Sequence, residues 1–148
     1  MFTDDFSKAP KFAQGTHMFY GGSNYTGLRA LIQLYFTWRR VVRRMKASPG
    51  YMGHFVWYKF PLGIGNFSIW DSYDNMMRFA QSSEHRKAVA WLVKPGTANG
   101  AFIRFCEIGA EGHSIGGWRA EADGEAWRIP RMPFSSGLRP PSEEIEAS

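Results

Sequence analysis

The sequence predicts an α+β fold in which a four-stranded antiparallel sheet carries two helices on one face. Two segments place apolar residues at helical spacing, and four shorter segments are rich in aromatic and β-branched residues. Gly- and Pro-containing stretches separate these segments. The length of 148 residues suits one domain with additional arms. In chain order the segments are strand, helix, strand, strand, helix and strand.

The first predicted elements are a short strand and a long helix. Residues 16–20 form the strand, which we expect to end at Gly21 and Gly22. Apolar residues then recur at intervals of three and four and predict a helix that stops at Ser48-Pro49-Gly50. These positions are Leu28, Leu31, Tyr35, Trp38, Val42 and Met45. The apolar surface of this helix is wider than one face, so the sheet alone cannot cover it. This predicts a second partner, either another subunit or a membrane surface.

A β-hairpin and a second helix follow. The aromatic-rich residues 51–60 and residues 66–71 predict two strands joined by a Pro- and Gly-containing turn. Asp71 or Ser72 supplies the N-cap of the second helix, which we expect to run to Lys94-Pro95-Gly96. The polar run at 81–83 is expected to bend this helix.

The last strand completes the ferredoxin-like arrangement. Residues 101–108 form this strand, and the resulting order β-α-β-β-α-β is the split βαβ motif. We therefore divide the chain into an N-terminal arm at 1–15, a ferredoxin-like domain at 16–108 and a Gly/Pro-rich C-terminal arm at 109–148.

Composition limits the classes of function. Apolar residues make up 44% and aromatic residues 16% of the chain, which excludes a disordered protein. We expect a cytoplasmic protein, because the N-terminus has no secretory signal pattern and no long apolar run occurs. The single cysteine, Cys106, can form neither an internal disulfide nor a zinc site alone.

Positive charge is concentrated on the first predicted helix. It carries Arg29, Arg39, Arg40, Arg43, Arg44 and Lys46, and no acidic residue occurs between Asp5 and Asp71. We expect a solvated face, with peripheral contact to an anionic membrane through the basic helix 28–46 as an alternative. No nucleic-acid partner is expected, because the chain has no recognised DNA- or RNA-binding motif.

Side-chain alternation divides each strand into two sets. We expect uniformly apolar sets to face the helices: Phe55 and Trp57; Phe67 and Ile69; Ala101, Ile103 and Phe105. The complementary sets mix rings with polar groups and are expected on the open face: His54, Val56 and Tyr58; Asn66, Ser68 and Trp70; Phe102, Arg104 and Cys106. Such a mixture suits a ligand cavity. The alternative is a face covered by a twin subunit, with the polar groups paired across that interface.

The open face suggests a catalytic site. His54 is the candidate general base, Tyr58 the hydroxyl donor and Arg104 the cation that stabilises an oxyanion. The candidate substrate-binding residues are Trp70, Phe102, Ser68, Val56 and Tyr20. This site would support oxygenation of a hydrophobic aromatic or polycyclic substrate, or a dehydration, isomerisation or cyclisation that starts with the same proton transfer. A non-catalytic ligand-binding dimer is the other class of function.

We expect no nucleotide cofactor and no metal. The chain has no Gly-rich phosphate loop, and Gly63-Ile64-Gly65 lies in the hairpin turn. The four histidines, His17, His54, His85 and His113, are not spaced as metal ligands.

Residues 66–92 resemble part of a known superfamily. A strand that ends in Trp70, a short acidic turn, the Phe79-Ala80 pair and the Ser-x-x-His step at 82–85 carry this resemblance. They are similar to the third strand and second helix of the monooxygenase-like dimeric α/β-barrel superfamily, nearest to its spheroidene-monooxygenase-like and antibiotic-biosynthesis-monooxygenase-like groups. The resemblance extends over about residues 16–108.

The resemblance implies a homodimeric α/β barrel and an enzyme of secondary metabolism, an oxidoreductase or a lyase or isomerase. Its families include cofactor-free oxygenases, haem proteins, dehydratases, isomerases and binding proteins, so the fold alone does not set the reaction. His85 matches the family's histidine, which commonly orients the helix start and so has a supporting role. Haem-binding branches carry their axial histidine further along this helix, where this chain has Ala88, Ala90 and Trp91. Haem therefore remains only an alternative, through His54 or His85.

Overall fold

A computed structural model describes residues 6–109 and 112. Its first elements are a 3₁₀ turn η1 (Lys11–Gln14), strand β1 (His17–Tyr25) and helix α1 (Leu28–Lys46). Strands β2 (Tyr51–Lys59) and β3 (Gly63–Trp70) form a hairpin. Helices α2 (Tyr73–Ala80) and α3 (Ser83–Leu92) precede strand β4 (Ala98–Glu107). Most of the predicted C-terminal arm, 109–148, and the start of the N-terminal arm lie outside the described residues.

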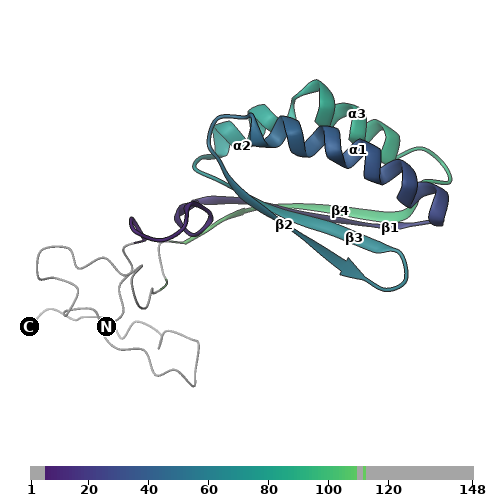
Figure 1. The fold of residues 1–148 in the computed structure, drawn as a ribbon, viewed down its shortest axis with the longest axis horizontal. Helices are drawn as coiled ribbons and strands as arrows, with labels where there is room; N and C mark the ends of the chain where they lie inside the picture. Colours follow the sequence, from purple (N-terminus) through teal and green to yellow (C-terminus); the bar gives the residue numbers. More distant parts are fainter. Residues whose placement is uncertain (1–5, 110–111, 113–148) are drawn as a thin grey trace, which may run out of the picture. The chain divides into compact units, whose positions relative to one another are not determined.

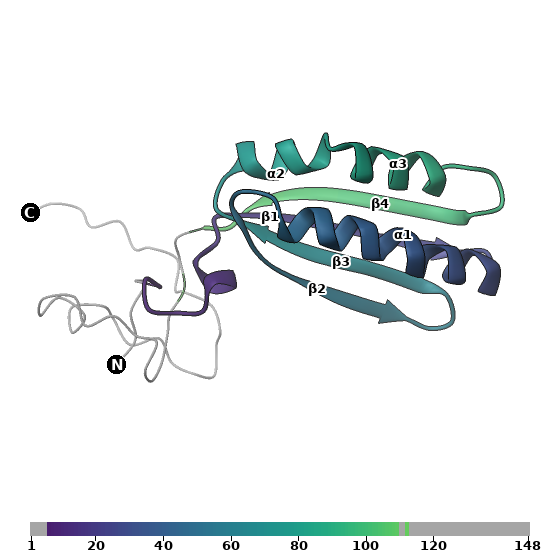
Figure 2. The same cartoon turned by 45° about the horizontal axis from the view of Figure 1, so that its top comes forward.

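The predicted ferredoxin-like α+β fold is confirmed. Within the described residues the four strands pair in the order β2-β3-β1-β4, and every pairing is antiparallel. All three helices lie on one face of this sheet, and the other face is left uncovered by helix (Figures 1 and 2). Among the described residues, no helix combines the length and the apolar character needed to cross a bilayer.

Several predicted boundaries are wrong: β3 begins at Gly63, within the predicted turn, and β4 begins at Ala98 instead of residue 101. β1 continues through Gly21 and Gly22 to Tyr25 instead of ending there. Gly22 is required for close packing, since a Cβ atom at this position would lie 2.3 Å from the Trp57 ring. The second predicted helix is divided into α2 and α3, because Ser82 starts a new helix by accepting a hydrogen bond from the His85 backbone N–H at 3.4 Å.

The core lies between the helices and the sheet. It consists of Phe19, Val41, Met45, Trp70, Met76 and Phe79. Trp70 is completely buried, and its indole Nε1–H donates to the hydroxyl of buried Ser68 at 3.0 Å. This bond satisfies the two polar groups that burial would otherwise leave without partners.

The predicted assignment of strand faces is wrong for β2 and β3. Ser68 pairs with Phe19 of the core on one side and with His54 on the other, so all three point towards the helices. The helix side of these strands therefore holds His54, Val56, Tyr58, Asn66, Ser68 and Trp70. For β4 the assignment is correct, since Phe105 pairs with Phe19 and its ring contacts the Phe19 ring at 5.8 Å.

The face without helices is lined with aromatic rings. Tyr20 stacks on Phe67 with ring centroids 4.7 Å apart and contacts Phe102 edge-on at 5.0 Å. Trp57 lies parallel to Phe102 at 6.3 Å. We call this set, together with the half-exposed Phe55, the aromatic face. The sequence-based assignment failed because it took the most apolar sets to be the helix-covered ones.

Candidate functional site

A cavity of about 400 Å³ lies between the helices and the sheet. This volume is within the range of sites for small organic ligands. Most of its wall is apolar and is formed by α1, α3 and the end of α2: Leu31, Leu34, Trp38, Phe79, Val89 and Trp91. The polar part of the wall includes Asn66 and His85, along with Ser23, Tyr25, Tyr35 and Thr37.

Small residues on the central strand β1 leave this space. Gly21 and Ser23 face the helices, because they pair with Asn66 and Ile64 on the helix side of β3. Gly21 has no side chain, and the side chain of Ser23 is too short to reach the helices. Above the sheet, Trp91 Nε1 of α3 donates to Gln33 Oε1 of α1 at 3.1 Å and links the two helices. The cavity is thus a consequence of small residues below and linked helices above.

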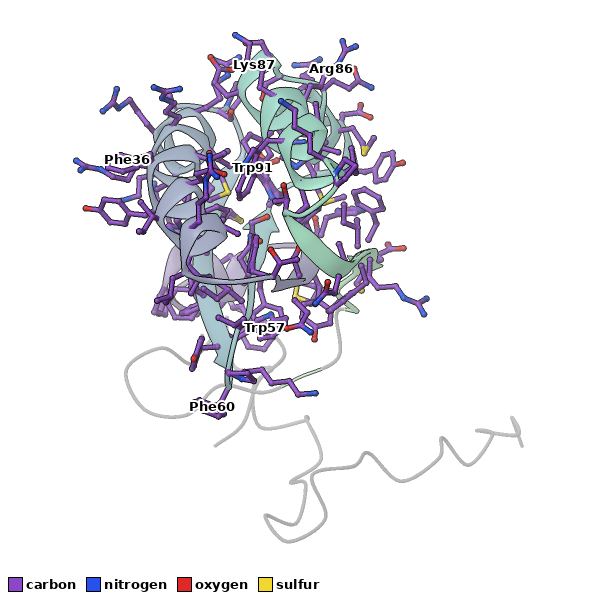
Figure 3. The ribbon with its side chains drawn as sticks, turned by 90° about the vertical axis from the view of Figure 1, so that its right-hand side faces the viewer. Phe36, Trp57, Phe60, Arg86, Lys87 and Trp91 are labelled. Atoms are coloured by element: carbon purple, nitrogen blue, oxygen red, sulfur yellow. The ribbon has the colours of Figure 1, made fainter. Side chains whose placement is uncertain are left out.

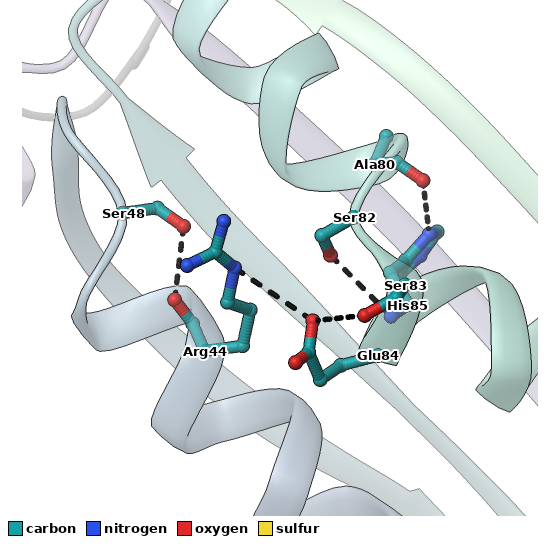
Figure 4. A network of polar contacts seen from close by, with 7 residues as sticks. All are labelled: Arg44, Ser48, Ala80, Ser82, Ser83, Glu84 and His85. Atoms are coloured by element: carbon teal, nitrogen blue, oxygen red, sulfur yellow. Dashed lines mark hydrogen bonds and ion pairs between the residues drawn. The ribbon is translucent and has the colours of Figure 1, made fainter.

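His85 is fixed at the junction of α2 and α3. Its Nδ1 lies 2.8 Å from the carbonyl oxygen of Ala80, which can only accept, so Nδ1 carries the proton (Figure 4). In the neutral ring, Nε2 is then unprotonated, and it has no hydrogen-bond partner among the described residues. The ring also contacts Phe19 and Phe79, with centroids 6.0 and 5.2 Å away. His85 therefore presents a basic nitrogen on the wall of an apolar cavity.

The environment of His85 favours the neutral form of its imidazole. Burial lowers the pKa of His85, and the hydrogen bond to Ala80 opposes this with a smaller effect. On the outer side of the same junction, Arg44 Nε of α1 and Glu84 Oε2 form an exposed ion pair at 3.7 Å (Figure 4). This surface pair contributes little stability, but it joins α1 to the start of α3.

The three predicted catalytic residues are not brought together. His54 and Tyr58 lie on the helix side of edge strand β2, whereas Arg104 lies on the aromatic face of the opposite edge strand, β4. His54 Nδ1 bonds the Tyr51 hydroxyl at 2.5 Å, and burial and the charge of Lys46 lower the pKa of His54. The Tyr58 hydroxyl donates to the carbonyl of Pro61 at 2.5 Å. The predicted common cavity of His54, Tyr58, Trp70 and Arg104 is therefore wrong.

The predicted substrate-binding residues divide into three groups. Val56 and Phe102 contribute to the cavity wall. Trp70 and Ser68 are buried beneath the helices and bond each other. Tyr20 lies on the aromatic face. Val56 and Asn66, which the sequence-based assignment put on the open face, line a cavity on the opposite, helix-covered side of the sheet.

Sequence reasoning did not select Asn66 as a site residue and gave His85 only a supporting role. The sequence pattern did point to Asn66, because it lies on the same side of its strand as Ser68 and Trp70, which were selected. Among the described residues, no three His, Cys, Asp or Glu side chains gather in a way that could hold a metal ion. Within that part of the chain, His85 is the histidine of the cavity wall, and its Nε2 is left without a hydrogen-bond partner.

Comparison with solved structures identifies the fold. SnoaB, a cofactor-independent oxygenase from Streptomyces nogalater, matches with a TM-score of 0.52 and 12% identity over 64% of this chain and 93% of that one. A Deinococcus radiodurans protein described as an antibiotic biosynthesis monooxygenase matches with a TM-score of 0.58 and 16% identity over 68% and 99%. The chain has the ferredoxin-like fold of the antibiotic biosynthesis monooxygenases. The predicted resemblance is confirmed at the level of fold.

A further antibiotic biosynthesis monooxygenase structure matches with a TM-score of 0.53 and 8% identity, over 62% of this chain and 97% of that one. No protein-family model and no curated protein matches the sequence. At these identities the shared feature is the fold, and any reaction has to be argued from the cavity itself.

Proposed function

We propose that this protein is a small-molecule tailoring enzyme of the monooxygenase-like type, in which His85 removes a proton from an aromatic substrate. The observation that carries the proposal is the state of His85. Its Nδ1–H is committed to Ala80, which leaves Nε2 free to accept a proton on the wall of the cavity. A supporting histidine would need only the bond to Ala80, without a place on a cavity wall.

The cavity favours an uncharged, flat substrate. Aromatic side chains from the three helices and the sheet form much of the wall, among them Phe19, Trp38, Phe79 and Trp91. No Lys, Arg, Asp or Glu belongs to the described lining, so a charged ligand would be desolvated without a counter-ion. The Asn66 amide can donate a hydrogen bond to an oxygen atom of the substrate, where negative charge develops when the proton leaves.

Dioxygen is the proposed oxidant. Once His85 has removed a proton from an electron-rich substrate, the resulting anion can supply electrons to O₂ directly. One oxygen atom then enters the substrate and the other leaves as water with two hydrogens from the substrate, so no external reductant is required. The likeness to SnoaB, a cofactor-independent oxygenase, supports this form of the reaction.

The test is oxygen uptake with a hydroxylated tricyclic aromatic compound as the probe. Binding is followed separately by quenching of tryptophan fluorescence, since Trp38 and Trp91 line the cavity. We expect His85→Gln to bind the probe and to turn it over at least about a hundredfold more slowly. His54→Gln is the matched control and should retain activity, because His54 is not part of the cavity wall.

Three results would contradict this proposal. Equal losses of turnover in the His85 and His54 variants would show that His85 is not the specific base. Probe consumption without oxygen uptake would show that the enzyme is a dehydratase, isomerase or cyclase that uses His85 as its base, and not an oxygenase. Binding without any turnover in the wild type would favour a ligand-binding protein.

A further inference from the structure

Within residues 11–109, the most exposed apolar side chains gather at the end of the sheet that holds the β2–β3 turn. Phe60 is 84% exposed, Leu28 and Val93 are each 74% exposed, and Ile32 is 62% exposed. They belong to the β2–β3 turn, to α1 and to the segment after α3. Two backbone bonds link the residues just before α1 to the other two segments: Tyr25 N–H to Leu62 O at 3.0 Å and Thr26 N–H to Thr97 O at 3.2 Å. Figure 3 views this end, with Phe60 at the hairpin turn and Phe36 on the outer side of α1.

The outer side of α1 changes character along its length. Its first half exposes Leu28, Ile32, Tyr35 and Phe36. Its second half exposes Arg39, Arg40 and Arg43 on the continuation of that side. Arg40 and Arg43 have no ion-pair partner among the described residues. We call the exposed apolar residues of α1, Phe60 and Val93 the apolar tip, and Arg39, Arg40 and Arg43 the basic collar.

Charge is distributed asymmetrically over residues 11–109. The four carboxylates of this part of the chain are Asp71, Asp74, Glu84 and Glu107. Asp71 and Glu107 lie at or next to the ends of β3 and β4 remote from the hairpin turn, and Asp74 lies on the adjoining α2. Glu84 is paired with Arg44 near the end of α1. The end with the apolar tip instead carries exposed Arg29, Lys59 and Lys94.

The cavity adjoins this surface. Tyr35 belongs both to the apolar tip and to the cavity wall, and its ring lies beneath the Arg39 guanidinium at 5.6 Å. Val56 of β2, the edge strand beside α1, is also part of the wall and is 53% exposed. Exposed residues of the cavity wall therefore lie beside the apolar tip.

We propose that the apolar tip and the basic collar bind an anionic lipid surface, so that the cavity wall formed by Tyr35 and Val56 lies beside the membrane. Protruding apolar side chains in front of exposed cations are typical of proteins that bind a membrane interface without spanning it. A second copy paired by two-fold symmetry would bring the arginines of the collar near one another. A nucleic acid would satisfy the arginines but leave the apolar tip in water. This inference does not depend on the reaction proposed above.

The test is co-sedimentation of the full chain with phosphatidylcholine vesicles, with and without phosphatidylglycerol. We expect binding to the vesicles that contain phosphatidylglycerol and weaker binding at high salt. The double variant Arg40→Gln/Arg43→Gln should bind roughly thirtyfold more weakly. Ile32→Ser/Phe36→Ser should bind about tenfold more weakly. It should also lose the vesicle binding that the wild type keeps at high salt.

The matched control is Arg86→Gln/Lys87→Gln on α3, which removes the same charge from another exposed surface (Figure 3). It should change binding less than threefold. The proposal is overturned if the wild type fails to sediment with anionic vesicles, or if the control weakens binding as much as the collar variant. It is also overturned if Ile32→Ser/Phe36→Ser binds like the wild type, or if this variant instead abolishes a self-association of the protein, because a second copy would then occupy the face.

Discussion

His85 links the folding stability of this protein to pH. Burial lowers its pKa in the folded state below the ordinary value of about 6.5, so in the pH range between the two values only the unfolded chain binds the proton. The contribution of the neutral ring is fully present above about pH 6.5 and is lost as the pH falls towards the folded-state pKa. His54 acts in the same direction, through burial and through the charge of Lys46.

We therefore expect the melting temperature to fall as the pH is lowered from about 6.5. His85→Gln should flatten this dependence, because glutamine has no proton to gain. Circular dichroism melts of both proteins across the acidic range measure the effect. Parallel curves for the wild type and the variant would show that the folded protein does not hold His85 neutral.

Individual residues also show why part of the site could not be predicted from the sequence. Trp70 and Ser68 were predicted to line a cavity because polar and aromatic side chains share one side of their strand. In the structure they are buried in the core and form a hydrogen bond with each other. Alternation divides a strand into two sets, but it does not say which set faces the helices. Only the pairing of Ser68 with Phe19, which the sequence does not encode locally, settles the question.

At the scale of elements, composition and periodicity predicted the four strands of the sheet and the two helical regions that cover it, but not the 3₁₀ turn η1. α1 was predictable because its apolar spacing and its stop at Pro49-Gly50 agree. The glycines of β1 and β3 were misread as turn signals, since Gly22 and Gly65 look the same in sequence whether they bend a chain or make room for a ring. In the structure both lie against the Trp57 indole.

Gly65 gives an element-scale prediction. A Cβ atom at Gly65 would lie 2.2 Å from the carbonyl oxygen of Gly21 and 2.3 Å from the Trp57 ring, so Gly65→Ala must displace the backbone of the sheet. We expect a loss of about 1–3 kcal/mol in the free energy of unfolding. Urea denaturation measures it. Gly100→Ala on β4 is the control, because nothing lies within 4 Å of its Cβ position. Similar stabilities for the two variants would contradict the packing of β1 against β3 and Trp57.

At the scale of the whole molecule, the aromatic face is contacted at its β2 edge by η1, where Phe12 packs edge-on against Phe55 at 5.4 Å, and its other rings have no covering element among the described residues. Half-exposed Phe55 and Phe102 lie on it, and the buried Trp57 Nε1 has no hydrogen-bond acceptor in the described part of the chain. A monomer rarely leaves such a continuous apolar surface in water. We therefore retain the homodimer expected from the sequence as a proposal, with the two aromatic faces packed against each other.

The sheets of two copies would then enclose the rings of both faces, as in other face-to-face sheet packings. We expect sedimentation at micromolar concentration to give a species of twice the 16.9 kDa chain mass. Phe55→Lys should convert it to the monomer without unfolding it, because Phe55 is 48% exposed within one chain and a lysine there would be desolvated only in the dimer. Tyr73→Lys, an exposed aromatic residue on α2, is the matched control and should leave the dimer intact. A wild-type protein that sediments at 16.9 kDa, or a dimer that Phe55→Lys does not dissociate, would contradict this arrangement.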